Sequence, residues 1–206
     1  MRLSLIAIVI VAGSATAAAQ EREFGAKAGP SFSRLAFEPD ESGGYDRRIA
    51  ADGGGFIVLP LAHRVALQLE ALFTAKGAEL YDPDQDLTGS IVLHYFDLPV
   101  LVRIQGARWG SGSFHVFGGP YAAFRLSAKR EVSTTAGLGR SGAKEDIRRE
   151  VERLDTGWVA GAGINAGRWI VVEGRYMRAL SALNTDKSDG FRIRNRAISI
   201  MAGVRF

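Results

Sequence analysis

The residues that could carry out catalysis are few in this chain. Its 206 residues include three histidines and no cysteine, which excludes thiolate nucleophiles, disulfides and Cys-ligated metals. A Ser-His-acid arrangement needs a base within hydrogen-bond reach of its nucleophile. His63 falls in a predicted turn, His94 on an outward face and His115 on an inward face, where a serine and a glutamate could lie opposite it. No local motif supports such a set, so we predict no catalytic residue, no metal site and no cofactor.

Charged residues form a second group with possible chemistry. They recur at period two on the more polar face of alternating stretches, and they are Lys27, Glu70, Asp97, Arg103, Arg125, Glu173, Arg175 and Arg205. Burying each charge singly would cost several kcal/mol, so we expect the carboxylates to pair with Arg and Lys neighbours. Two uses are open for such residues: a salt-bridged plug that fills a small barrel, or the lining of a narrow polar channel.

The elements that would position these residues are β-strands. From Arg22 onward, alternating apolar and polar stretches are separated by Gly, Asp, Asn, Ser and Pro, which is the strand signal. Connections alternate between long polar loops and turns of two to seven residues, as in transmembrane barrels with short periplasmic turns. The eight expected strands span 23–35, 51–61, 65–78, 90–105, 113–129, 156–166, 169–180 and 192–206.

The first residues differ from the rest of the chain. A positive start, an apolar run of about 10 residues and an Ala-rich end form the pattern of a secretory signal peptide, and the run is too short for a spanning helix of about 20 residues. We expect cleavage after Ala19, with a signal peptide over 1–19 and one barrel domain over 20–206. The net charge of +4 is too small and too scattered to indicate a nucleic-acid partner.

The alternation fits a membrane barrel or a soluble one, because either can place apolar side chains on one face. The export pattern, the strand length and the loop rhythm favour an all-β, eight-stranded antiparallel up-and-down transmembrane barrel with both termini in the periplasm. A soluble lipocalin-like ligand-binding barrel is the alternative. The aromatic residues that we expect on the outer face are Phe24, Phe32, Phe56, Phe73, Phe114, Phe124, Trp158, Tyr176 and Phe206.

Three further features suggest contacts outside the barrel. Arg192, Arg194 and Arg196 continue the outward register of the last strand, where they could bind lipopolysaccharide phosphates. Phe206, preceded by apolar residues at period two, resembles the C-terminal signal read by the barrel assembly machinery. We therefore expect this machinery to be the best-supported partner of the chain. The charged loop over 130–155 is predicted to form a short helix or a strand extension, with a Glu145–Arg149 i,i+4 pair, and is a possible contact site for a surface ligand.

Four motifs in order resemble the porin-like outer-membrane β-barrel domain family (PorT-type, similar to OmpA and OmpX barrels). Residues 24–33 read FGAKAGPSFS, with Ser31 where the family usually has Asn, and residues 65–78 read VALQLEALFTAKGA, with Phe73 in place of Tyr. YFDLPVLVR at 95–103 and FGGPY at 117–121 follow. The resemblance implies an outer-membrane location and a closed eight-stranded barrel, and it implies no reaction.

Together these features predict a noncatalytic outer-membrane barrel with a structural or surface-interaction role. The lumen would be filled by the charged network, and the membrane lipid, including lipopolysaccharide, would surround the barrel. A small-solute channel and a soluble ligand-binding barrel remain the alternatives.

Overall fold

The computed structural model describes residues 22–38, 45–82, 87–134, 141–147, 151–183 and 192–206. Within these ranges the chain is built of β-strands joined by turns and short irregular segments. The strands are β1 (Glu23–Glu38), β2 (Tyr45–Ala62), β3 (Val65–Asp82), β4 (Leu87–Trp109), β5 (Gly112–Thr134), β6 (Ser141–Asp146), β7 (Leu154–Ala166), β8 (Ile170–Ala179) and β9 (Arg192–Arg205).

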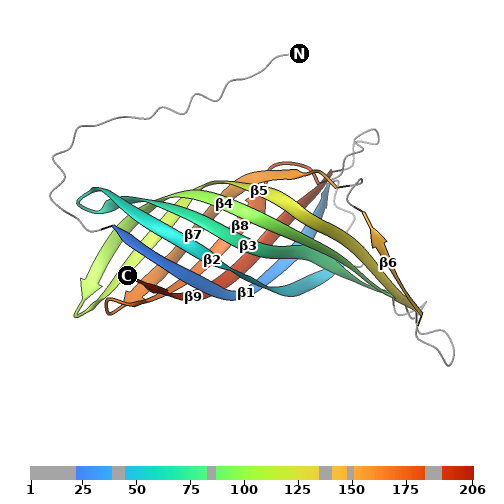
Figure 1. Ribbon diagram of the computed structural model, residues 1–206, viewed down its shortest axis with the longest axis horizontal. Helices are drawn as coiled ribbons and strands as arrows, with labels where there is room; N and C mark the ends of the chain where they lie inside the picture. Colours follow the sequence, from blue (N-terminus) through green and yellow to red (C-terminus); the bar gives the residue numbers. More distant parts are fainter. Residues whose placement is uncertain (1–21, 39–44, 83–86, 135–140, 148–150, 184–191) are drawn as a thin grey trace, which may run out of the picture.

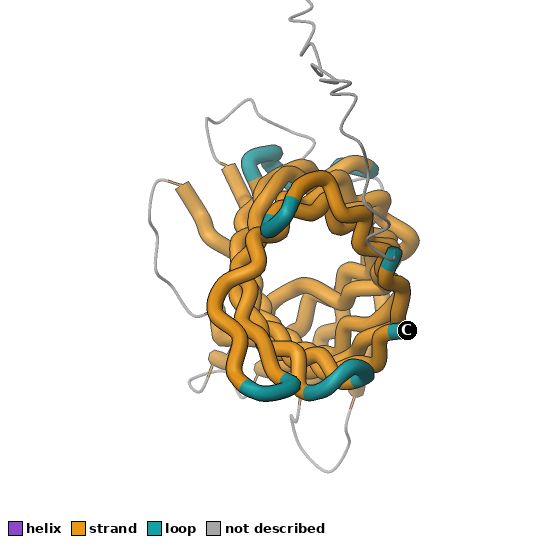
Figure 2. Tube along the Cα trace, turned by 90° about the vertical axis from the view of Figure 1, so that its left-hand side faces the viewer, coloured by secondary structure: helices purple, strands orange, loops and turns teal. Residues whose placement is uncertain are grey.

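Eight of these strands close into a barrel. The order of hydrogen-bonded neighbours is β4-β3-β2-β1-β9-β8-β7-β5, and an additional β4–β5 pairing completes the ring. Every pairing is antiparallel. The long tilted strands are seen in Figure 1 and the closed ring in Figure 2, which confirms the predicted fold.

The two ends of the barrel differ, as the connection lengths predict. The β2–β3, β4–β5 and β7–β8 connections are tight turns at one end, and Gly110 and Gly167 adopt positive φ angles of 50° and 63° there. The start of β1 and the end of β9 meet at this short-turn end, where Phe24 and Phe206 exchange backbone hydrogen bonds of 3.2 and 2.8 Å. The long connections all leave from the opposite end, which we call the long-loop end (Figure 1).

The charged loop contains a strand extension and not a helix over 141–146. β6 pairs with the far end of β5, from Lys129↔Asp146 to Thr134↔Ser141. Glu145 forms an ion pair of 3.5 Å with Arg130 on β5. The proposed partner Arg149 and the signal peptide lie outside the described residues.

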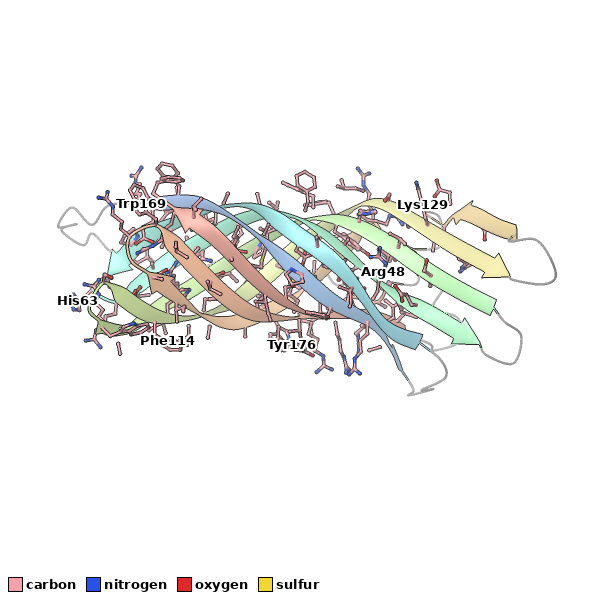
Figure 3. The ribbon with its side chains drawn as sticks, turned by 90° about the horizontal axis from the view of Figure 1, so that it is seen from below. Arg48, His63, Phe114, Lys129, Trp169 and Tyr176 are labelled. Atoms are coloured by element: carbon pink, nitrogen blue, oxygen red, sulfur yellow. The ribbon has the colours of Figure 1, made fainter. Side chains whose placement is uncertain are left out.

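Side chains alternate between the outer surface of the barrel and its lumen. On β9, Ile198, Ile200 and Val204 are exposed while Ser199 and Met201 are buried. Phe114, Trp169 and Tyr176 likewise project outward, and His63 marks the short-turn end (Figure 3). No helix among the described residues has the length and apolar character required to cross a bilayer.

The predicted outward position of one aromatic residue, Phe56, is wrong. Phe56 is only 6% exposed and points into the lumen, where Lys27 Nζ lies 5.0 Å from the centroid of its ring. The run Gly53-Gly54-Gly55 gives β2 no side-chain alternation to fix its register from sequence. Gly25 pairs with Phe56 on the neighbouring strand, and a Cβ there would lie 2.7 Å from the Phe56 ring, so the missing side chain makes room for the inward ring.

Candidate functional site: the filled lumen and the outer surface

Four charged side chains meet in the lumen near the short-turn end. Lys27 Nζ lies 2.7 Å from Glu70 Oε1 and 2.6 Å from Glu173 Oε2. The Arg175 guanidinium lies 2.6 Å from Glu70 Oε2 and 2.7 Å from Glu173 Oε2. All four side chains are at most 1% exposed. Two cations and two carboxylates thus alternate, and each buried charge has two partners, which offsets the cost of burying it.

Arg103 and three neutral polar side chains extend these ion pairs toward the short-turn end. Arg103 donates hydrogen bonds of 3.1 Å to Gln68 Oε1 and to Asn165 Oδ1. Arg103 also donates to His115 Nδ1 at 3.2 Å. A guanidinium has donors only, so Nδ1 must accept and Nε2 carries the hydrogen that it donates to Glu173 Oε1 at 3.2 Å. We call these eight residues the lumen network: Lys27, Gln68, Glu70, Arg103, His115, Asn165, Glu173 and Arg175.

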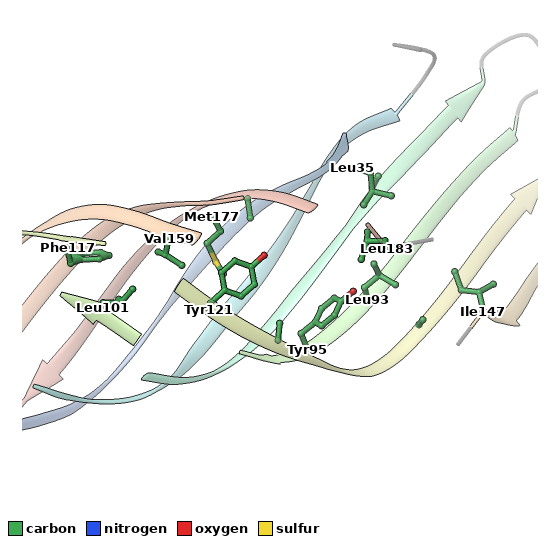
Figure 4. Close-up of a cluster of buried hydrophobic side chains, with 14 residues drawn as sticks. Leu35, Leu93, Tyr95, Leu101, Phe117, Tyr121, Ile147, Val159, Met177 and Leu183 are labelled. Carbon is green, nitrogen blue, oxygen red and sulfur yellow. The ribbon is translucent and has the colours of Figure 1, made fainter. Parts of the chain in front are cut away.

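An apolar layer lies farther along the lumen. Leu101, Phe117, Val159 and Met177 belong to one buried cluster, drawn in Figure 4. On their strands, Leu101 lies between Arg103 and Asp97, and Met177 follows Arg175 toward the long-loop end. The lumen network is therefore separated from the next polar groups by packed side chains.

A second polar cluster follows this layer. Lys76 Nζ lies 3.0 Å from Asp97 Oδ2 and 3.8 Å from Asp155 Oδ2. The same ammonium lies 4.8 and 4.9 Å from the ring centroids of Tyr95 and Tyr121, within cation–π range. One buried cation thus meets two carboxylates and two aromatic faces.

Hydrogen bonds tie this second cluster to the barrel wall. Asp155 accepts from Ser181 Oγ at 2.8 Å and from Asn195 Nδ2 at 2.9 Å. Asp52 accepts from Ser199 Oγ at 2.9 Å and from the Ala75 backbone N–H at 3.2 Å. These side chains come from β2, β7 and β9 and the segment after β8, so the cluster connects several walls.

The long-loop end is partly closed by apolar side chains. Ile147 and Leu183 are 3% and 4% exposed and pack in the same cluster as Leu35 and Leu93, as Figure 4 shows. Arg125, predicted to point inward, is half-buried and donates to the Val151 carbonyl. Parts of two long connections therefore fold into the core, although the sequence suggests only solvated loops.

The remaining predicted site residues lie at the two rims. Arg205 is half-buried at the short-turn end, 2.8 Å from Glu23 Oε1. Arg194 and Arg196 are half-exposed, and the buried Asn195 and Ala197 alternate with them, which places both arginines on the outer face. Arg192 begins β9, but its side chain lies outside the described ones. The Phe206 ring lies 5.8 Å from Phe24 and 5.5 Å from Trp169.

Several charged residues of the lumen are absent from the set predicted from the sequence. Lys76 continues the inward series Glu70, Leu72, Thr74 at period two, so its position was available from the pattern. Asp155 sits one residue before the expected strand, and Asp52 lies in the strand whose register the glycine run hides.

The three histidines do not form a catalytic set among the described residues. Both ring nitrogens of His115 are engaged, by Arg103 and Glu173, and the nearby Ser113 accepts from Asn165 and makes no hydrogen bond to that ring. His94 is exposed and bonds to Ser127 Oγ at 2.9 Å, and His63 lies in an exposed turn. The described part of the chain contains no group of three His, Cys, Asp or Glu placed to hold a metal ion.

Comparison with known proteins agrees with this architecture. The family model described as "Outer membrane protein beta-barrel domain" matches residues 18–184. Among solved structures, Ail, the attachment invasion locus protein of Yersinia pestis, is 14% identical with a TM-score of 0.50, and the alignment covers 91% of this chain and 100% of Ail. OprG from Pseudomonas aeruginosa is 9% identical with a TM-score of 0.46, covering 89% and 95%. Neisserial surface protein A is 8% identical with a TM-score of 0.44, covering 89% and 97%. No curated protein sequence matches the chain.

Proposed function

The chain belongs to the outer membrane protein beta-barrel domain family, and from that premise we propose that it is a noncatalytic barrel with a closed lumen and a structural or surface-interaction role. Its location is the outer membrane. The lumen network then acts as a plug, and the long-loop end presents the contact surface.

The ion pair between Glu70 and Arg175 is the observation that best supports a closed lumen. Glu70 lies on β3 and Arg175 on β8, and β2, β1 and β9 separate these strands in the ring. The ion pair therefore crosses the lumen instead of joining neighbouring strands. Lys27 on β1 donates to the carboxylates of Glu70 and Glu173. The apolar layer and the second polar cluster fill the lumen farther toward the long-loop end. A polar lumen with this arrangement holds its charges in pairs instead of leaving them available to a passing solute.

Conductance in a planar bilayer tests the closed lumen against the channel alternative. The folded wild-type protein should give no steady open-pore current. A variant with the crossing side chains truncated, Glu70→Ala with Arg175→Ala, tests whether these groups close the path. Steady single-channel currents from the wild type would favour a small-solute channel and overturn the plug.

The long-loop end supports the surface-interaction role. β4 and β5 run 23 residues each, well beyond the 9 to 11 that a tilted strand needs to span the bilayer, and β6 widens this extension. A paired sheet that projects beyond the membrane offers a rigid platform for a ligand of the 130–155 segment. This proposal places the short turns and both termini in the periplasm, after removal of residues 1–19.

Contacts with the envelope complete the proposal. Phe206 would present the C-terminal signal to the barrel assembly machinery, and Arg192, Arg194 and Arg196 would contact lipopolysaccharide. Absence of catalysis is tested with His115→Ala: cells carrying wild type or variant should yield identical lipid A by mass spectrometry. A lipid A modification seen only with the wild type would contradict the noncatalytic role.

A further inference from the structure

Three arginines from three neighbouring strands lie side by side on the outer surface. Arg196 on β9 pairs in register with Arg34 on β1 and with Arg178 on β8. Adjacent strands are about 4.8 Å apart, so the three Cα atoms lie within roughly 10 Å. Arg34 is exposed, and Arg178 and Arg196 are half-exposed. We call these residues the arginine row.

Like charges directly opposite each other on a sheet are destabilising. Within the described part of the chain, no carboxylate lies at ion-pair distance from Arg34, Arg178 or Arg196. The lumen arginine Arg175, by contrast, has two carboxylate partners. The arginine row is thus a concentration of positive charge whose counter-ion does not come from the described protein.

The arginine row lies directly next to an apolar strip, on its long-loop side. Two residues from each arginine toward the short-turn end lie Phe32, Ile198 and Tyr176, and Ile198 pairs in register with both Phe32 and Tyr176. Ile198 is 54% exposed. Tyr176 projects outward (Figure 3), and its ring packs at a tilt against the Trp158 ring, with 5.4 Å between the ring centroids. Cations above an apolar, aromatic strip match a molecule with a phosphate head and hydrocarbon tails.

Residues of the arginine row and of the apolar strip line one surface hollow. It has a volume of about 140 Å³ and is lined by Phe32, Arg34, Tyr176, Arg196, Ala197 and Ile198. Guanidinium groups and apolar rings therefore border one recess on the β1–β9–β8 surface. On β5, in contrast, the outward residues Phe124 and Leu126 are 43% and 51% exposed and apolar.

We propose that Arg34, Arg178 and Arg196 bind the phosphorylated head of an outer-leaflet glycolipid, of the lipid A type, and that one of its acyl chains lies over Phe32, Ile198 and Tyr176. Guanidinium groups bind phosphate oxygens by paired, charge-assisted hydrogen bonds, and the phosphate supplies the missing counter-charge. The inference rests on the proposed orientation in the outer membrane. It extends the proposed lipid contact of Arg196 on β9 to a site that spans β1, β9 and β8.

Binding of purified bisphosphorylated lipid A to the folded protein in detergent micelles tests this site. The variant carries Arg34→Ala, Arg178→Ala and Arg196→Ala. The matched control removes the same charge at the short-turn end, with Arg64→Ala, Arg108→Ala and Arg168→Ala, where the side chains are also exposed. Native mass spectrometry counts the bound lipid, and parallel titrations use dephosphorylated lipid A and inorganic phosphate.

The row variant should bind lipid A about tenfold or more weakly than wild type, and the control variant within about twofold. Dephosphorylated lipid A should bind the wild type as weakly as lipid A binds the row variant, and millimolar phosphate should compete poorly because it lacks the acyl chains. Equal binding by row variant and wild type, or equal loss in both variants, would overturn the site. Outer-membrane recovery and the gel shift on boiling, measured on the same row variant, report separately on the barrel itself.

Discussion

Arg175 Nη1 and Nη2 donate hydrogen bonds of 2.6 and 3.1 Å to the two carboxylate oxygens of Glu70, which lies on the far side of the lumen. The residues are 105 positions apart in the chain. This two-pronged ion pair joins opposite walls of the barrel, and Lys27 and Glu173 complete its charge balance.

Removing one charge from this balance should be costly. Glu70→Gln leaves Lys27 and Arg175 sharing one buried carboxylate, and breaking a buried pair costs about 3 to 5 kcal/mol. Urea unfolding of the protein in lipid vesicles, followed by tryptophan fluorescence, measures the loss. Adding Lys27→Met restores neutrality and should recover part of the stability.

The exposed pair Arg130–Glu145 supplies the control. Glu145→Gln should change the free energy of unfolding by less than about 1 kcal/mol, because exposed ion pairs contribute little. A Glu70→Gln variant as stable as Glu145→Gln would show that the crossing ion pair does not hold the lumen together.

Two glycines distinguish packing in the lumen from packing against lipid. A Cβ on Gly163 would lie 2.7 Å from His115 Nε2 and 2.8 Å from Glu173 Cγ, so Gly163→Ala should displace part of the lumen network and cost about 1 to 3 kcal/mol. A Cβ on Gly174 meets nothing within 4 Å. Gly174→Ala should therefore leave the urea midpoint nearly unchanged, and a reversed order of the two midpoints would contradict the lumen packing.

The terminal aromatic should act in assembly more than in stability. Phe206→Ala and Phe24→Ala each break their shared ring contact of 5.8 Å. Only Phe206→Ala also loses the Trp169 contact of 5.5 Å and removes the C-terminal aromatic. We expect a large loss from the outer-membrane fraction of cells for Phe206→Ala alone, with similar unfolding midpoints for the two purified variants. Equal cellular recovery of both variants would refute the assembly role.

Two deletions separate the projecting sheet from the core of the long-loop end. Removing 137–146 takes away β6 but keeps Ile147, so the barrel should still show its mobility shift on boiling. Removing 137–152 also takes away Ile147 and Val151, which pack in or against the apolar cluster, and should lower the free energy of unfolding by about 2 to 5 kcal/mol. Loss of both variants from the outer membrane would mean that the barrel does not fold independently of this loop.

The period-two pattern predicts most of the barrel because one face of each strand must be apolar and the other polar. It places Lys27, Glu70, Asp97, Arg103, Glu173 and Arg175 on one side of their strands, and these residues are buried in the lumen. The pattern fails where side chains are missing, as in the glycine run of β2, which hides the inward positions of Asp52 and Phe56. It also says nothing of partners across the ring, since Arg175 and Glu70 meet only when the barrel closes.

The outward and inward positions are tested most directly by a photoactivatable carbene reagent dissolved in the bilayer, with modified residues identified by mass spectrometry. Val100 and Ile200 are 44% and 52% exposed, whereas their chain neighbours Leu101 and Met201 are 0% and 1% exposed. The barrel predicts adducts on Val100 and Ile200 and none on Leu101 and Met201. Adducts on Leu101 and Met201, with Val100 and Ile200 unmodified, would contradict it.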